Sequence, residues 1–252
     1  MFLYILIADL SAFNICAQER DRESQHYLYS LINQIGFVRR IPVRPSGVIF
    51  SAEGEMDMLS NGDRVYIRET GEAPLIVGRT YMIYVTPEPI KDRRTDTYVG
   101  TQHHLTGLVE IVEKEPRFTV AKIVQSFRDI TINSFLMPYT RRSTEITLTE
   151  SVEGLDGEII APEDSNITIM GQDSIVFINK GKRHGVAPGQ QYSIYERHTA
   201  VPDPRAKEKI HLSAVDFGKL IVLHVEEDIS TAVITRSEKT VLVGSKIRSP
   251  IR

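Results

Sequence analysis

The sequence has few of the residues on which metal and redox sites depend. It contains one cysteine, Cys16, no tryptophan, and only one pair of adjacent histidines, His103 and His104. A single cysteine excludes an internal disulfide and a zinc site made of cysteines alone. Adjacent residues of a strand point to opposite faces, so the histidine pair is poorly placed to bind one metal ion. We therefore predict no metal site and no cofactor.

Motifs of the common catalytic families are also missing. The sequence has no GxSxG, HExxH, GxGxxG or phosphate-binding-loop motif. Asp63 and Asp173 each come just before an expected strand, where a carboxylate caps a turn more often than it acts as an acid or base. Among the five other histidines, four lie far apart in the second half of the chain: His184, His198, His211 and His224. We therefore predict that the protein is not an enzyme and has no catalytic residues.

The overall charge gives no general attraction to polyanions. The formal net charge is −3 at pH 7, which argues against a nucleic-acid partner and against binding to an anionic membrane. The apolar run that opens the chain is too short to span a bilayer. We predict neither a nucleic-acid partner nor a transmembrane segment.

Residues 1–17 resemble a secretory signal peptide. The chain turns abruptly polar at Gln18, and Ile15 and Ala17 fit the −3 and −1 positions of a cleavage site. The usual basic start is missing and Asp9 interrupts the apolar run, so a start site inside a longer gene and a buried strand are the alternatives. On the signal-peptide interpretation, the protein is periplasmic or associated with the outer membrane.

The remaining composition favours a mainly β protein. Valine, isoleucine, threonine and tyrosine are plentiful, and amphipathic helical periodicity is hard to find after residue 40. Before that point, residues 18–45 are interpreted as a charged linker or a short helix. The helix would run through Tyr27, Leu28, Leu31, Ile32 and Ile35. Gly36 is well suited to end that helix.

The chain repeats itself at an offset of 111 positions. A glycine and two tyrosines of residues 71–84 (GEAPLIVGRTYMIY) recur in residues 181–195 (GKRHGVAPGQQYSIY). These matched residues are Gly78, Tyr81 and Tyr84 in the first half and Gly189, Tyr192 and Tyr195 in the second. Pro188 and Gly189 suit the two central positions of a type II turn, because proline presets φ and glycine accepts a positive φ. A duplicated unit of strand, tight turn and strand is therefore expected.

The later parts of the two halves match best. Residues 107–112 lie over residues 218–223, and residues 119–124 lie over residues 230–235. Short acidic turns separate these strands, so they should pair antiparallel and close small barrels. We predict two tandem small antiparallel β-barrel-like domains from an internal duplication. The expected parts are a signal peptide at 1–17, a linker or short helix at 18–45, β domain 1 at 46–140, a linker at 141–155 and β domain 2 at 156–252.

Each half also contains a long polar insertion, at residues 86–104 and 199–214. Loops of this length often carry binding function, although a plain insertion at a barrel rim is the alternative. The four matched tyrosines could stack on sugar rings. Side chains alternate along a strand, however, so half of them should point into a core.

Four motifs of the second half follow one another in a fixed order. They are Asp173-x-x-Val-Phe-Ile-x-x-Gly, Gly185-Val-x-Pro-Gly-x-x-Tyr-x-Ile-Tyr195, Gly218-x-Leu-x-Val-Leu and Ser230-Thr-Ala-Val-Ile-Thr-Arg-Ser237. This series resembles the C-terminal region of bacterial envelope proteins that carry an N-terminal LysM domain. It is also similar to the C-terminal domain of flagellar assembly protein T. The resemblance covers about residues 37–250 and implies a periplasmic, non-catalytic scaffold of tandem β modules.

The same resemblance implies which partners the protein binds. The 252 residues include no LysM segment, so peptidoglycan binding is not transferred to any residue of this sequence. Envelope proteins, such as those of a pilus or flagellar assembly, are the expected partners. A peptidoglycan- or carbohydrate-binding module is the alternative.

Overall fold

The computed structural model describes residues 25–54, 58–71, 73–201 and 209–250. The predicted signal peptide at residues 1–17 lies outside these ranges. Within them the regular structure is made of β-strands and one 3-10 turn, η1 (Lys182–His184). In the described ranges, no helix has the length and apolar character needed to cross a membrane.

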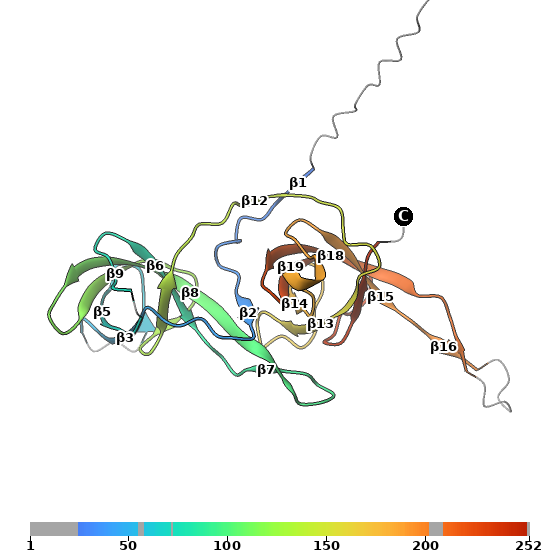
Figure 1. Ribbon diagram of the computed structural model, residues 1–252, viewed down its shortest axis with the longest axis horizontal. Helices are drawn as coiled ribbons and strands as arrows, with labels where there is room; N and C mark the ends of the chain where they lie inside the picture. The colour runs from blue at the N-terminus through green and yellow to red at the C-terminus, as the bar shows by residue number, and fades with distance from the viewer. Residues whose placement is uncertain (1–24, 55–57, 72, 202–208, 251–252) are drawn as a thin grey trace, which may run out of the picture.

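The first half forms a closed barrel of six antiparallel strands, barrel 1 (Figure 1). In order around the barrel, the strands are β3 (Gly47–Ala52), β5 (Arg64–Glu69), β9 (Thr119–Ser126), β8 (Tyr98–Lys114), β6 (Thr80–Val85) and β11 (Phe135–Pro138). Alternate β-branched side chains fill the interior, including Ile49, Ile67 and Val109, each fully buried. Two short strands, β4 (Met58–Leu59) and β10 (Ile130–Thr131), pair beside it.

The second half forms barrel 2 with the same strand order. Its strands are β13 (Asp156–Pro162), β14 (Ile175–Ile178), β19 (Ser230–Ser237), β18 (Val215–Val225), β15 (Gln191–Glu196) and β20 (Lys246–Arg248). Tyr192, Ile194 and Leu220 are among the fully buried side chains of its core. Among the described strands, no ladder of hydrogen bonds joins one barrel to the other.

The predicted duplication into two tandem antiparallel barrels is confirmed. The bounds of β15 and β19 repeat those of β6 and β9 at the offset of 111 positions. The same offset relates positions of positive φ at three turns, which fixes where each barrel reverses direction. These pairs are Gly62 and Asp173, Gly78 and Gly189, and Asn133 and Gly244.

The expected short N-terminal helix is wrong for the described residues from position 25 onward. β1 (His26–Leu28) pairs instead with β12 (Glu145–Thr147), and a turn follows it. Ile32 and Ile35 are 1% and 2% exposed, whereas Leu28 is 74% exposed, so the apolar residues do not form one helical face. Residues 25–39, here called the N-terminal strap, pack on the outer surface of barrel 2 and end in β2 (Phe37–Arg39), which pairs with β8.

The two insertions also differ from the expected loops. Residues 86–104 form a hairpin of β7 (Ile90–Lys91) with the outer half of β8, here called the first arm, and it packs against barrel 2. In the second half, β16 (Thr199–Ala200) pairs with β17 (Ile210–His211). This second arm, residues 199–201 and 209–212, projects away from both barrels (Figure 1). Cross-strand pairing satisfies the backbone of these polar segments, which the loop interpretation left unpaired.

The turn at Pro188 and Gly189 has the predicted form. Gly189 has φ +87°, and the N–H of Gln190 donates to the carbonyl of Ala187 at 3.4 Å. A Cβ atom built on Gly189 would lie 1.9 Å from the carbonyl oxygen of Thr147 in the linker, whereas one on Gly78 would meet nothing within 4 Å. The linker therefore packs directly on the second turn and leaves the first one open.

We expect Gly189→Val to lower the free energy of unfolding by about 3 kcal/mol or more. Its matched control, Gly78→Val, should cost only about 1–2 kcal/mol, because it introduces a strained φ without a backbone clash. Urea unfolding of both variants, followed by circular dichroism, measures the difference. Equal losses would show that the contact between linker and turn contributes nothing.

Candidate functional site

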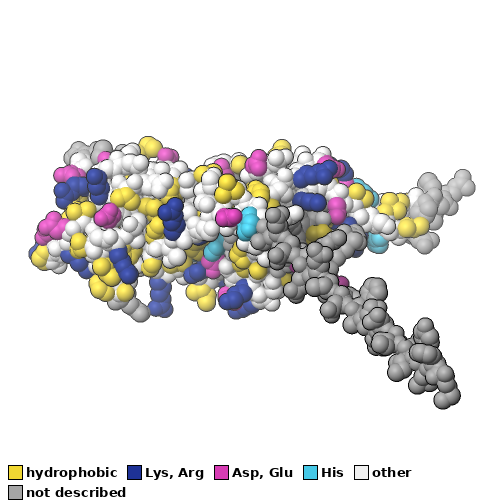
Figure 2. Space-filling model, turned by 90° about the horizontal axis from the view of Figure 1, so that it is seen from above, with side chains coloured by type: hydrophobic (Ala, Val, Ile, Leu, Met, Phe, Trp, Pro, Cys, Tyr) yellow, Lys and Arg dark blue, Asp and Glu magenta, His cyan; other side chains and the backbone are white. Residues whose placement is uncertain are grey.

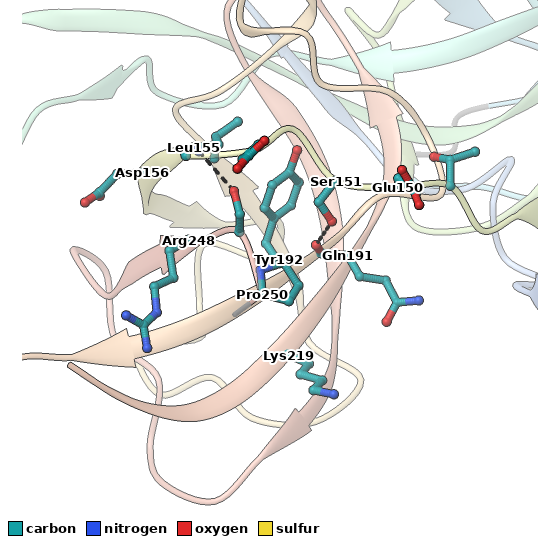
Figure 3. Close-up of a pocket in the computed structure, with 13 residues that line it drawn as sticks. Glu150, Ser151, Leu155, Asp156, Gln191, Tyr192, Lys219, Arg248 and Pro250 are labelled. Atoms are coloured by element: carbon teal, nitrogen blue, oxygen red, sulfur yellow. Dashed lines mark hydrogen bonds between the residues drawn. The ribbon is translucent and has the colours of Figure 1, made fainter. Parts of the chain in front are cut away.

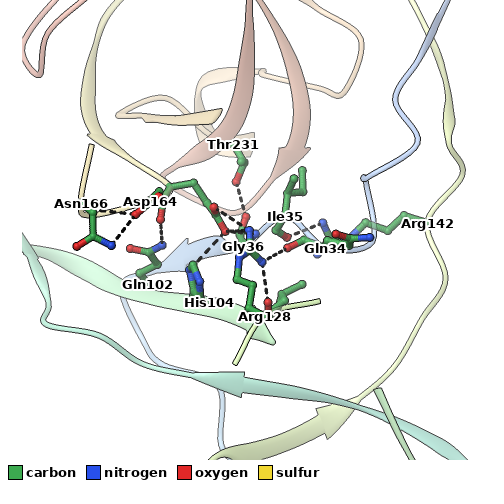
Figure 4. Close-up of polar contacts among 12 residues, drawn as sticks. Gln34, Ile35, Gly36, Gln102, His104, Arg128, Arg142, Asp164, Asn166 and Thr231 are labelled. Carbon is green, nitrogen blue, oxygen red and sulfur yellow. Dashed lines mark hydrogen bonds and ion pairs between the residues drawn. The ribbon is translucent and has the colours of Figure 1, made fainter. Parts of the chain in front are cut away.

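A buried carboxylate, that of Glu163, joins the two barrels. Figure 4 shows the groups around it, among them Gly36, Arg128 and His104. Glu163 follows β13 of barrel 2 and is 4% exposed. Arg128 of barrel 1 donates from Nη2 to both carboxylate oxygens, at 3.0 and 3.2 Å. The backbone N–H of Gly36, in the N-terminal strap, donates to Oε1 at 3.2 Å. One side chain of barrel 2 is thus hydrogen-bonded to the strap and to barrel 1.

Further hydrogen bonds surround this carboxylate. Gln102 donates from Nε2 to the backbone carbonyl of Glu163 at 2.6 Å, and Thr231 donates to the carbonyl of Gly36 at 3.0 Å. Arg128 also donates from Nη1 to two backbone carbonyls, one in the strap and one in β8. Buried charges are stable only when they are paired and hydrogen-bonded, so these groups act as structural connectors.

His104 contacts the same carboxylate from barrel 1. Its Nδ1 lies 3.5 Å from Oε1 of Glu163. Burial lowers the pKa of His104, and this effect outweighs the neighbouring carboxylate, which raises it. The imidazole is therefore neutral at neutral pH. An open groove of about 750 Å³ runs past these residues. The carboxylate of Glu163 in this groove already accepts hydrogen bonds from Arg128 and from the backbone N–H of Gly36.

A second polar cluster connects the strap with the edge of barrel 2. Arg39 donates to Glu226 at 2.7 Å, and Nε2 of His224 lies 2.9 Å from the same carboxylate. Burial alone would raise the pKa of Glu226, but the hydrogen bonds from His224 and Arg39 lower it overall. Burial lowers the pKa of His224 despite this carboxylate. Both partners are thus held at the junction of the barrels rather than in an open cavity.

His103, the other half of the histidine pair, is fully buried. Its Nε2 accepts a hydrogen bond from the N–H of Val43 at 3.0 Å, and its ring stacks on Phe37 at 4.6 Å between centroids. Burial, followed by the nearby charge of Arg39, lowers the pKa of His103 to about 4. His103 and His104 therefore occupy separate environments, in agreement with the expected geometry of neighbouring strand residues.

An open groove of about 880 Å³ lies on barrel 2, here called the barrel 2 groove (Figure 3). The linker and the strands β15, β18 and β20 line it. Ser151 donates to the carbonyl of Gln191, Ser249 donates to the carbonyl of Val152, and the hydroxyl of Tyr195 donates to Asp156 at 2.8 Å. Among the described lining residues there is no histidine beside a serine.

The other residues singled out from the sequence are dispersed. Asp63 caps a turn by accepting from the N–H of Ser60 at 2.7 Å, while Asp173 itself occupies a positive-φ position. His184 accepts from the N–H of Gly181 at 3.1 Å in a local turn. In the parts of the chain that the structure describes, no three His, Cys, Asp or Glu side chains are grouped to hold a metal ion.

The alternation of side chains along a strand predicts half of the matched tyrosines at the surface, where they could stack on sugar rings, and the structure contradicts this because all four are buried. Tyr81, Tyr84, Tyr192 and Tyr195 are between 0% and 6% exposed, because these strands face packed side chains on both sides. Aromatic side chains are instead exposed together on barrel 1, at Phe50, Tyr66 and Phe118, here called the aromatic patch. Its signal in the sequence is weak, since the three residues come from three separate strands or turns.

No family model matches the chain, and no curated protein matches it either.

Breaking the buried pair at the junction should weaken the whole structure. We expect Glu163→Ala to lower the free energy of unfolding by about 2–4 kcal/mol, because Arg128 and the N–H of Gly36 lose their acceptor in a largely buried site. The exposed pair of Arg236 and Glu238 provides the control, since Glu238→Ala should cost less than about 0.5 kcal/mol. Chemical unfolding of both variants is the measurement, and equal costs would contradict a structural role for Glu163.

The buried His103 should make stability depend on pH. Its pKa is about 4 in the folded protein and about 6.5 in the unfolded chain, so the unfolded chain binds more protons between these values. Stability is therefore complete above pH 6.5 and is lost as pH falls, by about 2 kcal/mol at pH 5 for this group. We expect His103→Gln to remove this part of the pH dependence and the exposed His198→Gln to leave it. Unfolding curves at pH 7 and pH 5 test this, and parallel losses in all three proteins would contradict it.

Proposed function

We propose that the protein is a non-catalytic scaffold or assembly module of the bacterial cell envelope that acts through protein–protein contacts. The main support is that polar side chains at the barrel junction and in the barrel 2 groove are engaged in hydrogen bonds within the protein. The charged groups at the barrel junction are hydrogen-bonded within the protein, and the serines of the barrel 2 groove donate to backbone carbonyls. A protein built in this way presents surfaces rather than a reactive centre.

Two features favour assembly over a flexible chain of modules. The strap and the first arm bury side chains of both halves in shared apolar clusters, so the barrels form one extended unit. At the far end of this unit, the second arm exposes apolar side chains to solvent. Val201, Ile210 and Leu212 are between 44% and 48% exposed, and grouped exposed hydrophobic residues are typical of interaction sites.

The proposed location depends on the N-terminal segment and on the resemblance of the second-half motifs to LysM-associated envelope proteins. We infer export to the periplasm, with cleavage ahead of Gln18. Envelope proteins, including those of a pilus or a flagellar basal structure, are the proposed partners. Peptidoglycan is the second candidate, and the grouping of three aromatic rings on barrel 1 is the observation that favours it.

Fractionation of the native host tests the location. We expect the protein in the periplasmic or outer-membrane fraction, with a mature N-terminus at Gln18 by mass spectrometry. A cytoplasmic protein that retains Met1 would contradict the proposal.

Binding to purified sacculi separates the two partner classes. We expect the protein to remain in the supernatant and, in cells, to crosslink to envelope proteins. Firm sedimentation with sacculi that Phe50→Ala abolishes and Leu242→Ala leaves unchanged would favour the glycan-binding module. Leu242 is a suitable control because it is 47% exposed on barrel 2, against 43% for Phe50.

A further inference from the structure

Within the chain, the first arm docks on the outside of barrel 2. Ile90 and Val99 of the arm pack against Phe177 and Ile229 of barrel 2, next to Ile160. Phe177 and Ile229 are 0% and 3% exposed, and Val38 of the strap packs in the same cluster. Arg94 of the arm adds an ion pair with Glu158, at 3.4 Å. This internal arm contact shows which face of a barrel accepts an arm in this fold.

The same face exists on barrel 1 and consists of the aromatic patch. In barrel 2, Ile159 and Ala161 of β13 pair with successive residues of β14, and Ile160 between them has no partner in this ladder. In barrel 1 the ladder skips Phe50 in the same way, between Ile49 and Ser51. Phe50 is therefore the structural equivalent of Ile160.

The other two positions follow from the same register. Ser51 pairs with Tyr66 as Ala161 pairs with Phe177, so Tyr66 corresponds to Phe177. Phe118 precedes β9 as Ile229 precedes β19, at the offset of 111 positions. All three docking positions of barrel 2 thus have an aromatic counterpart on barrel 1.

These counterparts are not covered as those of barrel 2 are. Phe50 is 43% exposed, and Tyr66 and Phe118 are partly exposed. Their rings contact one another, with centroids 5.4 Å apart for Tyr66 and Phe118 and 6.4 Å apart for Phe50 and Phe118. Three neighbouring rings at the surface form a preformed apolar platform of the kind that is enriched in protein interfaces.

The second arm also carries exposed apolar residues. Counted along the sequence, the offset of 111 positions places Val201 over Ile90 and Ile210 over Val99. The two hairpins differ in register, since Ile90 pairs with Gly100 whereas Thr199 pairs with His211. Val201 is 48% exposed and Ile210 is 44% exposed. The arm extends into solvent instead of reaching a barrel, and hydrophobic side chains lie at the surface of that end of the molecule (Figure 2). The chain therefore presents one uncovered arm and one uncovered arm-binding face.

We propose that the second arm of one molecule docks on the aromatic patch of a second copy and repeats the internal arm contact between molecules. The two surfaces lie at opposite ends of the elongated molecule, with β16 at one end and β3, β5 and β9 at the other (Figure 1). An arm cannot reach the patch of its own chain in this arrangement. The contact is head-to-tail, so it builds a ring if the rotation closes and a filament if it does not.

This proposal specifies one partner of the proposed scaffold, a second copy of itself, and it is tested on purified protein independently of cellular location. Sedimentation velocity of the full chain over a range of concentrations is the first measurement. We expect species larger than a dimer, or one closed ring, to grow with concentration. A monomer at every concentration up to about 0.5 mM would overturn the proposal.

Two variants test the direction of the contact. Ile210→Arg disables the arm but keeps the patch, and Phe50→Arg disables the patch but keeps the arm. Each variant alone should be monomeric, whereas their equimolar mixture should give a heterodimer and nothing larger. Leu242→Arg, an equally exposed site on barrel 2, should assemble like the unmodified chain.

Other outcomes contradict the head-to-tail arrangement. Dimers of the Phe50→Arg variant alone would show that arms pair with arms, and dimers of the Ile210→Arg variant alone would show that patches pair with patches. If the unmodified chain stays monomeric while muropeptides shift the aromatic resonances of the patch, the patch binds glycan. If Phe50→Arg does not melt cooperatively, Phe118→Ala takes its place in the mixing experiment.

Discussion

The Glu163 carboxylate is the interaction on which the relative placement of the two barrels depends. A carboxylate that is 4% exposed must be compensated fully, and here the compensation comes from Arg128 of barrel 1 and from the N–H of Gly36 in the strap. Any side chain at Gly36 would clash with the backbone, because a Cβ atom there would lie 2.6 Å from the carbonyl oxygen of His103. Strap, barrel 1 and barrel 2 are therefore fixed at one point.

The sequence predicted what is local in this fold. Strand, tight turn and strand recur at one offset because Gly78 and Gly189 meet the same steric demand, and both donate their N–H to equivalent residues of the next hairpin at 2.8 Å. Even the substitution of Gly62 by Asp173 at positive φ keeps the turn, since aspartate tolerates this conformation. Local rules of this kind can be read from one sequence.

What the sequence could not supply depends on contacts between distant parts of the chain. The strap was expected to be helical because its apolar spacing was considered alone, whereas Ile32 and Ile35 are buried against barrel 2. The candidate site likewise forms only through contacts between residues far apart in the sequence. Glu163 and Arg128 have no distinguishing motif, and Phe50 becomes important only once its place in the strand register is known.

The proposed contact between molecules should be weaker than the internal arm contact, for a physical reason. The internal one includes Val38 of the strap and a covalent connection, which keeps arm and barrel at a high effective concentration. A contact between two molecules has neither advantage and pays the full cost of association. Such a contact is weak in dilute solution and becomes significant where copies are already concentrated. A scaffold with this property would assemble at its site of use, such as a confined envelope structure, and remain dispersed elsewhere.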